Sequence, residues 1–271
     1  MLGRMNQDLS LHQRRRAPTA QDLAGIPWLD ALLPLERERA VRALCVGDAL
    51  GGDYVCRVGR PVTYWFGVVE GLLKMSTDNE QGQTMTFAGM PPGGWFGEGT
   101  VVKREPYRYH VRALRRSVVA GLPLETFHWL LDHSIGFNRF VMGQLNERLG
   151  QFIAAREIDR MTNPDLRVAR SLAALFNPVL YPGVGAVLRI TQQELAYLVG
   201  LSRQRVNEAL AALEAQGAIR VEYGGLRVLD LAALRSGDFA AAAEAAATGT
   251  GTRARRSRRA CTAAALTLSG C

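Results

Sequence analysis

Apolar residues change their spacing twice along the chain, and this divides the sequence into three stretches. From Ile26 to Cys45 they recur at helical spacing. From Gly47 to Leu124 short apolar runs alternate with glycine- and proline-containing turn signals, which is typical of an antiparallel β sandwich or barrel. Helical spacing returns after Leu124 and continues to about Met161. We therefore predict an α+β protein in which a β domain is followed by helices.

One long helix is predicted from Ser134 to about Met161, a stretch that contains no proline. Its apolar residues keep a 3-4-3 spacing, which is typical of helices that pair in a coiled coil. We predict that this helix pairs with its copy in a second chain. Packing on the β domain of its own chain is the alternative, and both hold if different faces are used. The predicted dimer seam consists of Met142, Leu145, Leu149 and Phe152, and the spacing continues through Arg156 and Asp159.

The sharpest local pattern lies between Ile190 and Leu213 and predicts two helices joined by a tight turn. Thr191 can cap the first helix, and Glu194 three residues later completes a capping box. Gly200 can adopt the left-handed conformation that ends this helix, and Ser202 can cap the second one. The pattern therefore predicts a helix-turn-helix.

Polar donors gather at the start of the second predicted helix. Arginine pairs with guanine O6 and N7, and glutamine or asparagine pairs with adenine N6 and N7. Recognition helices enter the major groove with their N-terminal residues. The predicted base contacts are Arg203, Gln204, Arg205 and Asn207. The predicted phosphate contacts are Thr191, Gln193 and Ser202.

A tight β-hairpin is predicted directly after these helices. Residues 218–223 and 226–229 supply its strands, and Gly224-Gly225 supplies its turn. This hairpin is interpreted as the wing of a winged helix. A plain two-helix corner inside a core is the alternative, but such a corner needs no Arg-Gln-Arg at its exposed start. The sequence therefore favours binding to double-stranded DNA.

The positive net charge of the chain agrees with a polyanionic partner but adds little to the evidence for DNA binding. The formal net charge is +8, and nearly all basic residues are arginines. Five of them lie in the last nineteen residues, so their surplus says little about the folded domains. No run of about 18 apolar residues and no secretory signal is found, which predicts a cytoplasmic protein without a membrane span.

Candidate chemistry for an enzyme or a metal site is weak. Four cysteines are present without a CxxC pair, which favours free thiols over a metal site. No G-x-S-x-G, P-loop or HExxH motif occurs. Glu98 with His110 is the one imaginable acid–base pair, and we expect both to be structural. The sequence therefore predicts neither an enzyme nor a bound metal.

The helix-turn-helix, together with Trp95-Phe96-Gly97-Glu98 in the β region, resembles the Crp/Fnr superfamily of transcription regulators. The resemblance covers roughly Leu32 to Leu234. It implies an N-terminal antiparallel β-roll of the cyclic-nucleotide-binding type, a long dimerisation helix and a C-terminal winged helix-turn-helix. It also implies a homodimer on a palindromic operator, and RNA polymerase as a partner. A ligand-sensing module that signals through a protein partner remains the alternative function.

The resemblance also indicates where a small-molecule effector could bind in the β-roll, and no other cofactor is predicted. In members that bind cyclic AMP, a Gly-Glu pair precedes an Arg-Ser-Ala type segment that holds the phosphate. Gly97, Glu98 and Arg108 match as ligand-binding candidates, but bulky Tyr109 and His110 replace the small residues. Phe152 and Ile153 stand where those members contact adenine. Cyclic AMP is therefore disfavoured, while a different effector and no effector both stay open.

The recognition helix departs from the pattern of many relatives at one position. Many relatives carry Ser-Arg-Glu where this chain has Ser202-Arg203-Gln204, which predicts an operator different from that of the cyclic AMP receptor.

Domain boundaries follow from the patterns above, with the best one at Asn163-Pro164. The predicted segments are a flexible leader (1–25), a β-roll sensor domain (26–133), a dimerisation helix (134–162), a winged helix-turn-helix domain (163–236) and a disordered tail (237–271).

Overall fold

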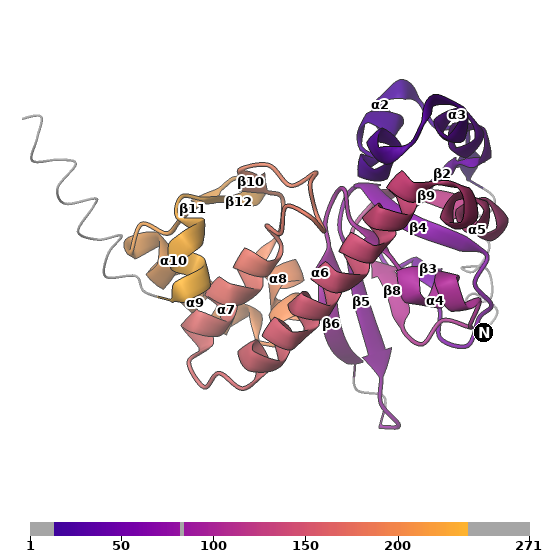
Figure 1. Ribbon diagram of the computed structural model, residues 1–271. Helices are drawn as coiled ribbons and strands as arrows, with labels where there is room; N and C mark the ends of the chain where they lie inside the picture. The colour runs from indigo at the N-terminus through magenta and orange to yellow at the C-terminus, as the bar shows by residue number, and fades with distance from the viewer. Residues whose placement is uncertain (1–13, 82–83, 238–271) are drawn as a thin grey trace, which may run out of the picture.

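The computed structural model describes residues 14–81 and 84–237. A β domain and a helical domain lie at opposite ends of the long helix α6 (Figure 1). The predictions made for residues 1–13 and 238–271, including the disordered tail, lie outside the described residues.

Two antiparallel sheets form the β domain and confirm the predicted β-roll. One sheet has the strand order β1-β2-β9-β4-β7 and the other has the order β3-β8-β5-β6. All pairings are antiparallel. The strands are β1 (Arg15–Arg16), β2 (Cys45–Ala49), β3 (Tyr54–Cys56), β4 (Tyr64–Glu70), β5 (Leu73–Asp78), β6 (Thr84–Met90), β7 (Trp95–Phe96), β8 (His110–Ala113) and β9 (Ser117–Pro123).

Aromatic rings fill the core of this domain. Trp65 on β4 and Trp95 on β7 lie 4.5 Å apart between ring centroids, and Trp28 contacts both. Phe127 of helix α5 (Leu124–His133) and Phe137 of helix α6 (Ile135–Asp159) pack against them edge-on. Large aromatic side chains bury much apolar area and prefer such tilted contacts. The core therefore joins the sheets to both helices.

The N-terminal residues depart from the prediction of a flexible leader over 1–25, which is wrong from Arg14 onward. Strand β1 pairs with β2, and helix α2 (Ala20–Ala24) begins at a capping box formed by Thr19 and Asp22. Asp22 also forms an ion pair with Arg16, and this guanidinium holds the pKa of the carboxyl well below its usual range. Hydrogen bonds and the ion pairs Arg14–Asp53 and Arg16–Asp22 order this segment, so no apolar periodicity was available to predict it. Helix α3 (Pro34–Ala43) follows a 3-10 turn at Pro27–Ala31.

Helix α6 uses two faces differently. Phe137, Val141, Gln144 and Arg148 are buried at a spacing of four, three and four residues. The predicted seam lies on another face and is exposed in the single chain, with Leu149 60% exposed. This helix therefore packs on its own β domain and still presents an apolar face.

The C-terminal helices and strands form a winged helix, here called the winged domain. Its three-stranded sheet has the order β10-β12-β11, and β10 was not predicted. Glu222 pairs with Gly225, so the hairpin turn is Tyr223-Gly224, one residue earlier than predicted. Gly225 lies in strand β12, where a Cβ would stand only 2.8 Å from the carbonyl oxygen of Leu188 on β10. The elements are α7 (Pro164–Ala174), β10 (Val187–Leu188), α8 (Gln192–Val199), α9 (Arg203–Ala215), β11 (Ile219–Glu222), β12 (Gly225–Val228) and α10 (Leu231–Ser236).

Gly136, near the start of α6, provides a test of this packing. A Cβ on Gly136 would overlap the carbonyl oxygen of Ala31, whereas a Cβ on Gly143 in the same helix would meet no atom within 4 Å. Gly136→Ala should therefore lower the thermal midpoint, because overpacking costs about 1–3 kcal/mol. Gly143→Ala should raise or preserve it, because alanine favours helix over glycine by about 1 kcal/mol. Equal midpoints for the two variants, measured by circular dichroism, would contradict this packing.

Candidate DNA-binding surface and effector cavity

Capping contacts fix both helices of the helix-turn-helix as the sequence predicted. The Thr191 hydroxyl accepts from the Glu194 amide at 3.1 Å, and the Thr191 amide donates to the Glu194 carboxylate at 2.7 Å. Gly200 has a φ of 71°, which ends α8 in the left-handed region. The Ser202 hydroxyl accepts from the Arg205 amide at 3.2 Å and begins α9.

Apolar contacts between α8 and α9 decide which face of α9 is free. Leu195 and Val199 of α8 pack with Val206 and Leu210 of α9 in the core of the winged domain. The N-terminal turn of α9 is left at the surface by this packing. Five of the predicted DNA contacts are exposed: Thr191, Gln193, Ser202, Arg203 and Gln204.

The other two predicted base contacts are less available. Arg205 is half-buried and forms ion pairs with Asp165 at 2.6 Å and Glu208 at 3.1 Å. Asn207 is also half-buried, and its side-chain oxygen has no hydrogen-bond partner among the described residues. Arg205 thus joins the start of α9 to the start of α7. The prediction did not foresee this, because Asp165 lies forty residues earlier in the chain.

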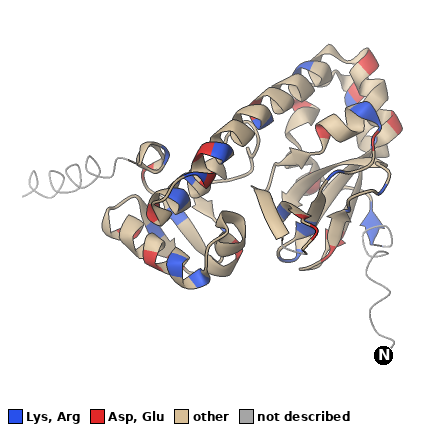
Figure 2. Cartoon of the chain, turned by 90° about the horizontal axis from the view of Figure 1, so that it is seen from below, with Lys and Arg blue, Asp and Glu red and all other residues tan. Residues whose placement is uncertain are grey.

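The wing lies beside α9 in the fold, and Tyr223 at its tip is fully exposed. An ion pair between Glu222 and Arg227 joins the two strands of the hairpin. Residues 163–236 contain eight arginines and six acidic residues, and both signs occur on this domain (Figure 2). The formal net charge of this domain is therefore only +2, from eight arginines minus six acidic residues.

A cavity of about 1620 Å³ opens between β6, α6, α7 and α8. Gly97, Glu98 and Arg108, the three predicted ligand-binding residues, all line it. Gly97 has a φ of 87° and begins helix α4 (Glu98–Lys103). The structure thus brings the three candidates to one cavity, although their surroundings within it differ.

Glu98 is buried and lies 3.5 Å from the guanidinium of Arg148 on α6. Arg148 also donates to the carbonyl of Trp95 at 2.7 Å and to the hydroxyl of Tyr181 at 3.0 Å. Arg148 was not among the residues predicted from the sequence. Its spacing from Phe137 and Val141 on the buried face of α6 was the signal that could have found it.

Arg108 and Tyr109 line this cavity in different surroundings. The Arg108 side chain is exposed and pairs with Glu105 at 2.8 Å. The Tyr109 hydroxyl lies 3.4 Å from where a Cβ on Gly97 would stand, and burial raises the pKa of this hydroxyl. Tyr109 thus lies against Gly97, one of the three predicted ligand-binding residues.

Other site types have little support in the part of the chain that the structure describes. No group of three or more His, Cys, Asp or Glu side chains could hold a metal ion among residues 14–81 and 84–237. Burial raises the pKa of the Cys56 thiol, which disfavours the reactive thiolate. In the same ranges no helix has both the length and the apolar character that a membrane crossing requires.

Comparisons with known proteins agree with both halves of the fold. A cyclic nucleotide-binding domain model matches residues 49–134, and a Crp-like helix-turn-helix domain model matches residues 166–236. The transcriptional regulator SdrP of Thermus thermophilus is 31% identical over 174 residues, which cover 62% of this chain and 80% of SdrP. The chain belongs to the Crp/Fnr family. The cAMP-activated regulator Vfr of Pseudomonas aeruginosa is 26% identical over 58% of this chain and 76% of Vfr.

Solved structures resemble this Crp/Fnr protein in fold. FixK2 from Bradyrhizobium japonicum matches with a TM-score of 0.57 and 15% identity, covering 70% of this chain and 95% of FixK2. A Crp/Fnr regulator from Eubacterium rectale matches with a TM-score of 0.52 and 16% identity, covering 79% and 98%. This Crp/Fnr protein is a DNA-binding transcription regulator, as the sequence predicted, and such regulators are not enzymes.

Proposed function

We propose that this regulator binds a palindromic operator as a homodimer, with the N-terminal turn of α9 in the major groove. The observation that carries this proposal is the exposed pair Arg203 and Gln204 at the start of helix α9, which Ser202 caps. Both side chains present donors that suit purine edges in the major groove. Thr191, Gln193 and Ser202 flank them and suit contacts with phosphates.

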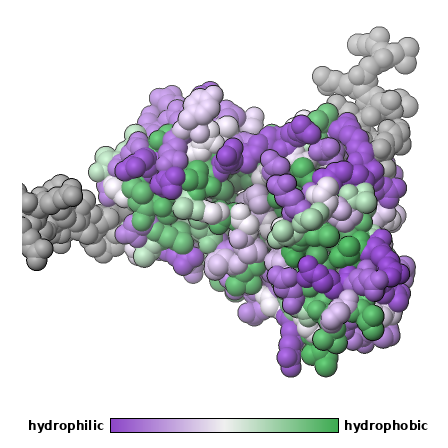
Figure 3. Space-filling model, turned by 90° about the horizontal axis from the view of Figure 1, so that it is seen from above, coloured by the Kyte–Doolittle hydropathy of each residue, from purple (hydrophilic) through white to green (hydrophobic). Residues whose placement is uncertain are grey.

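The homodimer is supported by the exposed face of α6. Met142, Leu145, Leu149 and Phe152 are all exposed in the single chain, although they keep coiled-coil spacing. Hydrophobic patches interrupt the hydrophilic surface on both domains (Figure 3). A second copy of the same helix would cover the α6 seam, because a two-fold interface uses the same surface patch of both chains.

The proposed division of the chain follows the same logic. Residues 26–133 form the sensor domain, 134–162 the dimerisation helix and 163–236 the DNA-binding domain. Matches at residues 49–134 and 166–236, on either side of α6, support these boundaries. We also propose RNA polymerase as a partner and the cytoplasm as the location, both from membership of the family.

The cavity beside Glu98 suits a small-molecule effector other than cyclic AMP. Tyr109 replaces a small residue beside Gly97, and Arg108 is paired with Glu105. Phe152 and Ile153 offer no hydroxyl for an adenine ring. A buried phosphate needs space and donors, and these substitutions reduce both.

Selection of bound DNA from a random pool tests the proposed function. We expect enrichment of a two-fold symmetric sequence with half-site centres about one helical turn apart, or a multiple of it. Because Gln204 stands where many relatives have glutamate, the enriched base pair at that position should differ from that of cyclic AMP receptors. Affinity should fall steeply with rising salt, as for other phosphate-contacting proteins.

Two results of that selection would contradict the proposal. A protein that forms no salt-sensitive complex with any DNA would instead favour signalling through a protein partner. Enrichment of the half-site of cyclic AMP receptors would contradict the role given to Gln204. Adding cyclic AMP should leave the affinity of the protein for the selected operator unchanged. A marked increase in that affinity would overturn the effector assignment.

A further inference from the structure

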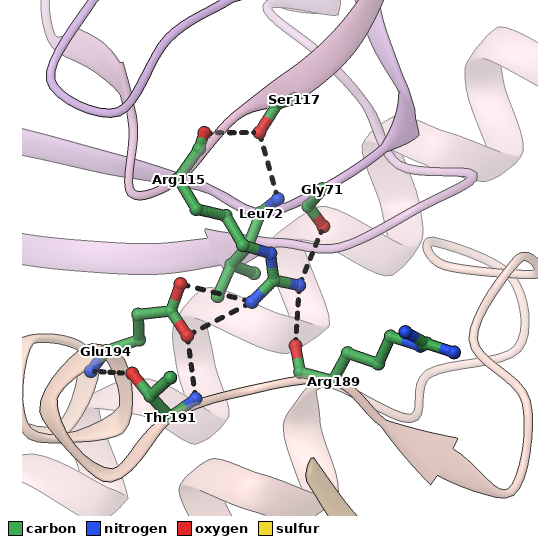
Figure 4. A network of polar contacts seen from close by, with 7 residues as sticks. All are labelled: Gly71, Leu72, Arg115, Ser117, Arg189, Thr191 and Glu194. Carbon is green, nitrogen blue, oxygen red and sulfur yellow. Dashed lines mark hydrogen bonds and ion pairs between the residues drawn. The ribbon is translucent and has the colours of Figure 1, made fainter. Parts of the chain in front are cut away.

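Arg115 joins the β domain to the winged domain through several polar contacts (Figure 4). It lies in the loop between β8 and β9. Its guanidinium donates to both oxygens of Glu194 at 3.1 and 3.0 Å and to the carbonyl of Arg189 at 2.6 Å. A fourth contact reaches the carbonyl of Gly71 in its own domain at 3.4 Å. One side chain therefore contacts both domains.

Glu194, the acceptor on the winged domain, is held in place by contacts that do not involve Arg115. Glu194 is nine-tenths buried and already receives the amide of Thr191 in the capping box of α8. Its carboxylate also lies at the positive end of that helix. Glu194 therefore loses little conformational freedom when it binds Arg115, and the position of its carboxylate fixes where the Arg115 guanidinium must lie.

The β-domain end of the contact is equally fixed. The Ser117 hydroxyl donates to the carbonyl of Arg115 at 2.9 Å and accepts from the amide of Leu72 at 3.1 Å. Leu72 belongs to the β domain by sequence, but its side chain is fully buried in the apolar core of the winged domain. The ion pair thus stands beside an apolar contact between the same two surfaces.

We propose that Arg115 is a positioning residue that fixes the orientation of α9 relative to α6. Helix α8 is the intermediate, because Arg115 contacts its first turn and its apolar face packs on α9. In a dimer paired through α6, this orientation sets the distance and angle between the two recognition helices. Arg115 therefore determines which half-site spacing the operator must have, an inference that rests on the proposed function.

Two features make this role separable from folding and from DNA contact. Tyr181, from the loop between α7 and β10, is buried in the β-domain core and accepts from Arg148. This second contact keeps the domains together when Arg115 is changed. Arg203 and Gln204 stay exposed while Arg115 is bound to Glu194, so the docked arrangement leaves the recognition surface free.

The experiment compares two DNA duplexes. One is the operator that the wild-type protein selects, and the other carries one additional base pair between the half-sites, which rotates them by about 35°. The wild-type protein should strongly prefer the first. Arg115→Gln should reduce the ratio of the two affinities about tenfold, the size expected for one coupled ion pair. Glu194→Gln keeps the capping box and should reduce the ratio equally, and the double variant should reduce it no further.

Arg116→Gln is the matched control, because Arg116 is an exposed neighbour that pairs with Asp48 inside the β domain. It should leave the ratio unchanged. An unchanged ratio in Arg115→Gln would overturn the proposal. A lower salt slope in Arg115→Gln but not in Glu194→Gln would also overturn it, because that result means a direct phosphate contact. A wild-type protein that selects no symmetric operator would overturn the proposed function itself, and this inference with it.

Discussion

Replacing Arg203 with alanine should weaken binding to the selected operator about a thousandfold. A bidentate contact between arginine and guanine is worth about 1–3 kcal/mol, and a dimer makes it twice, which gives about 2–6 kcal/mol in total. Arg203 is exposed in the first turn of α9 and has no partner among the described residues, so its removal leaves the fold intact. Fluorescence anisotropy with a labelled operator duplex measures the loss.

Base specificity gives this prediction its sharpest form. Wild-type protein should discriminate against operators in which the guanine facing Arg203 is replaced, and Arg203→Ala should bind original and replaced operators almost equally. Arg42→Ala removes the same charge from α3, where Arg42 pairs with Glu38, and should change neither affinity. Equal losses in the two variants would mean that only net charge matters and would contradict the assigned contact.

The parts of the fold predicted correctly are those determined by neighbours in the sequence. Thr191, Glu194, Gly200 and Ser202 lie within twelve residues, and each capping contact that they make spans three or four residues. The antiparallel β domain was predicted for the same reason, since turn signals and short apolar runs are local, whereas the β-roll itself was implied by the family resemblance. The helix-turn-helix was therefore predictable residue by residue.

Contacts between distant segments were not predictable in this way. Arg115 and Glu194 are 79 residues apart, and Arg148 and Glu98 are fifty. Helical spacing places Arg148 on the buried face of α6, but no local pattern indicates which carboxylate it will meet there. These pairs form because the two domains and α6 meet in space, and they lie at the cavity beside Glu98 and at the domain interface.

Within helix α9, the predicted base contacts also differ in whether local sequence or a distant partner determines their exposure. Arg203 and Gln204 were correctly expected at the surface, because caps and apolar spacing determine which side of α9 faces outward. Arg205 carries equally suitable donors but is paired with Asp165 on α7. Helical geometry places a side chain on a face, whereas tertiary partners decide whether that side chain is free.

Replacing Leu149 with glutamate should convert the proposed dimer into a folded monomer. Leu149 is 60% exposed in the single chain and occupies the middle of the α6 seam, so the β-domain core does not depend on it. Burying a leucine contributes about 1.5–3 kcal/mol, and a two-fold seam buries it twice. A glutamate at this position in both chains would also place two like charges in an apolar interface. The association constant should fall at least about a hundredfold, as measured by analytical ultracentrifugation.

The affinity of Leu149→Glu for the operator should fall together with its dimerisation, because a monomer contacts a single half-site. Leu35→Glu is the matched control, since Leu35 is 80% exposed on α3 and lies outside the seam. It should leave both the dimer and the operator affinity unchanged. A Leu149→Glu protein that stays dimeric with full affinity would show that another surface pairs the chains. Loss of DNA binding with an intact dimer would instead mean that α6 transmits an orientation to the winged domain rather than holding two copies together.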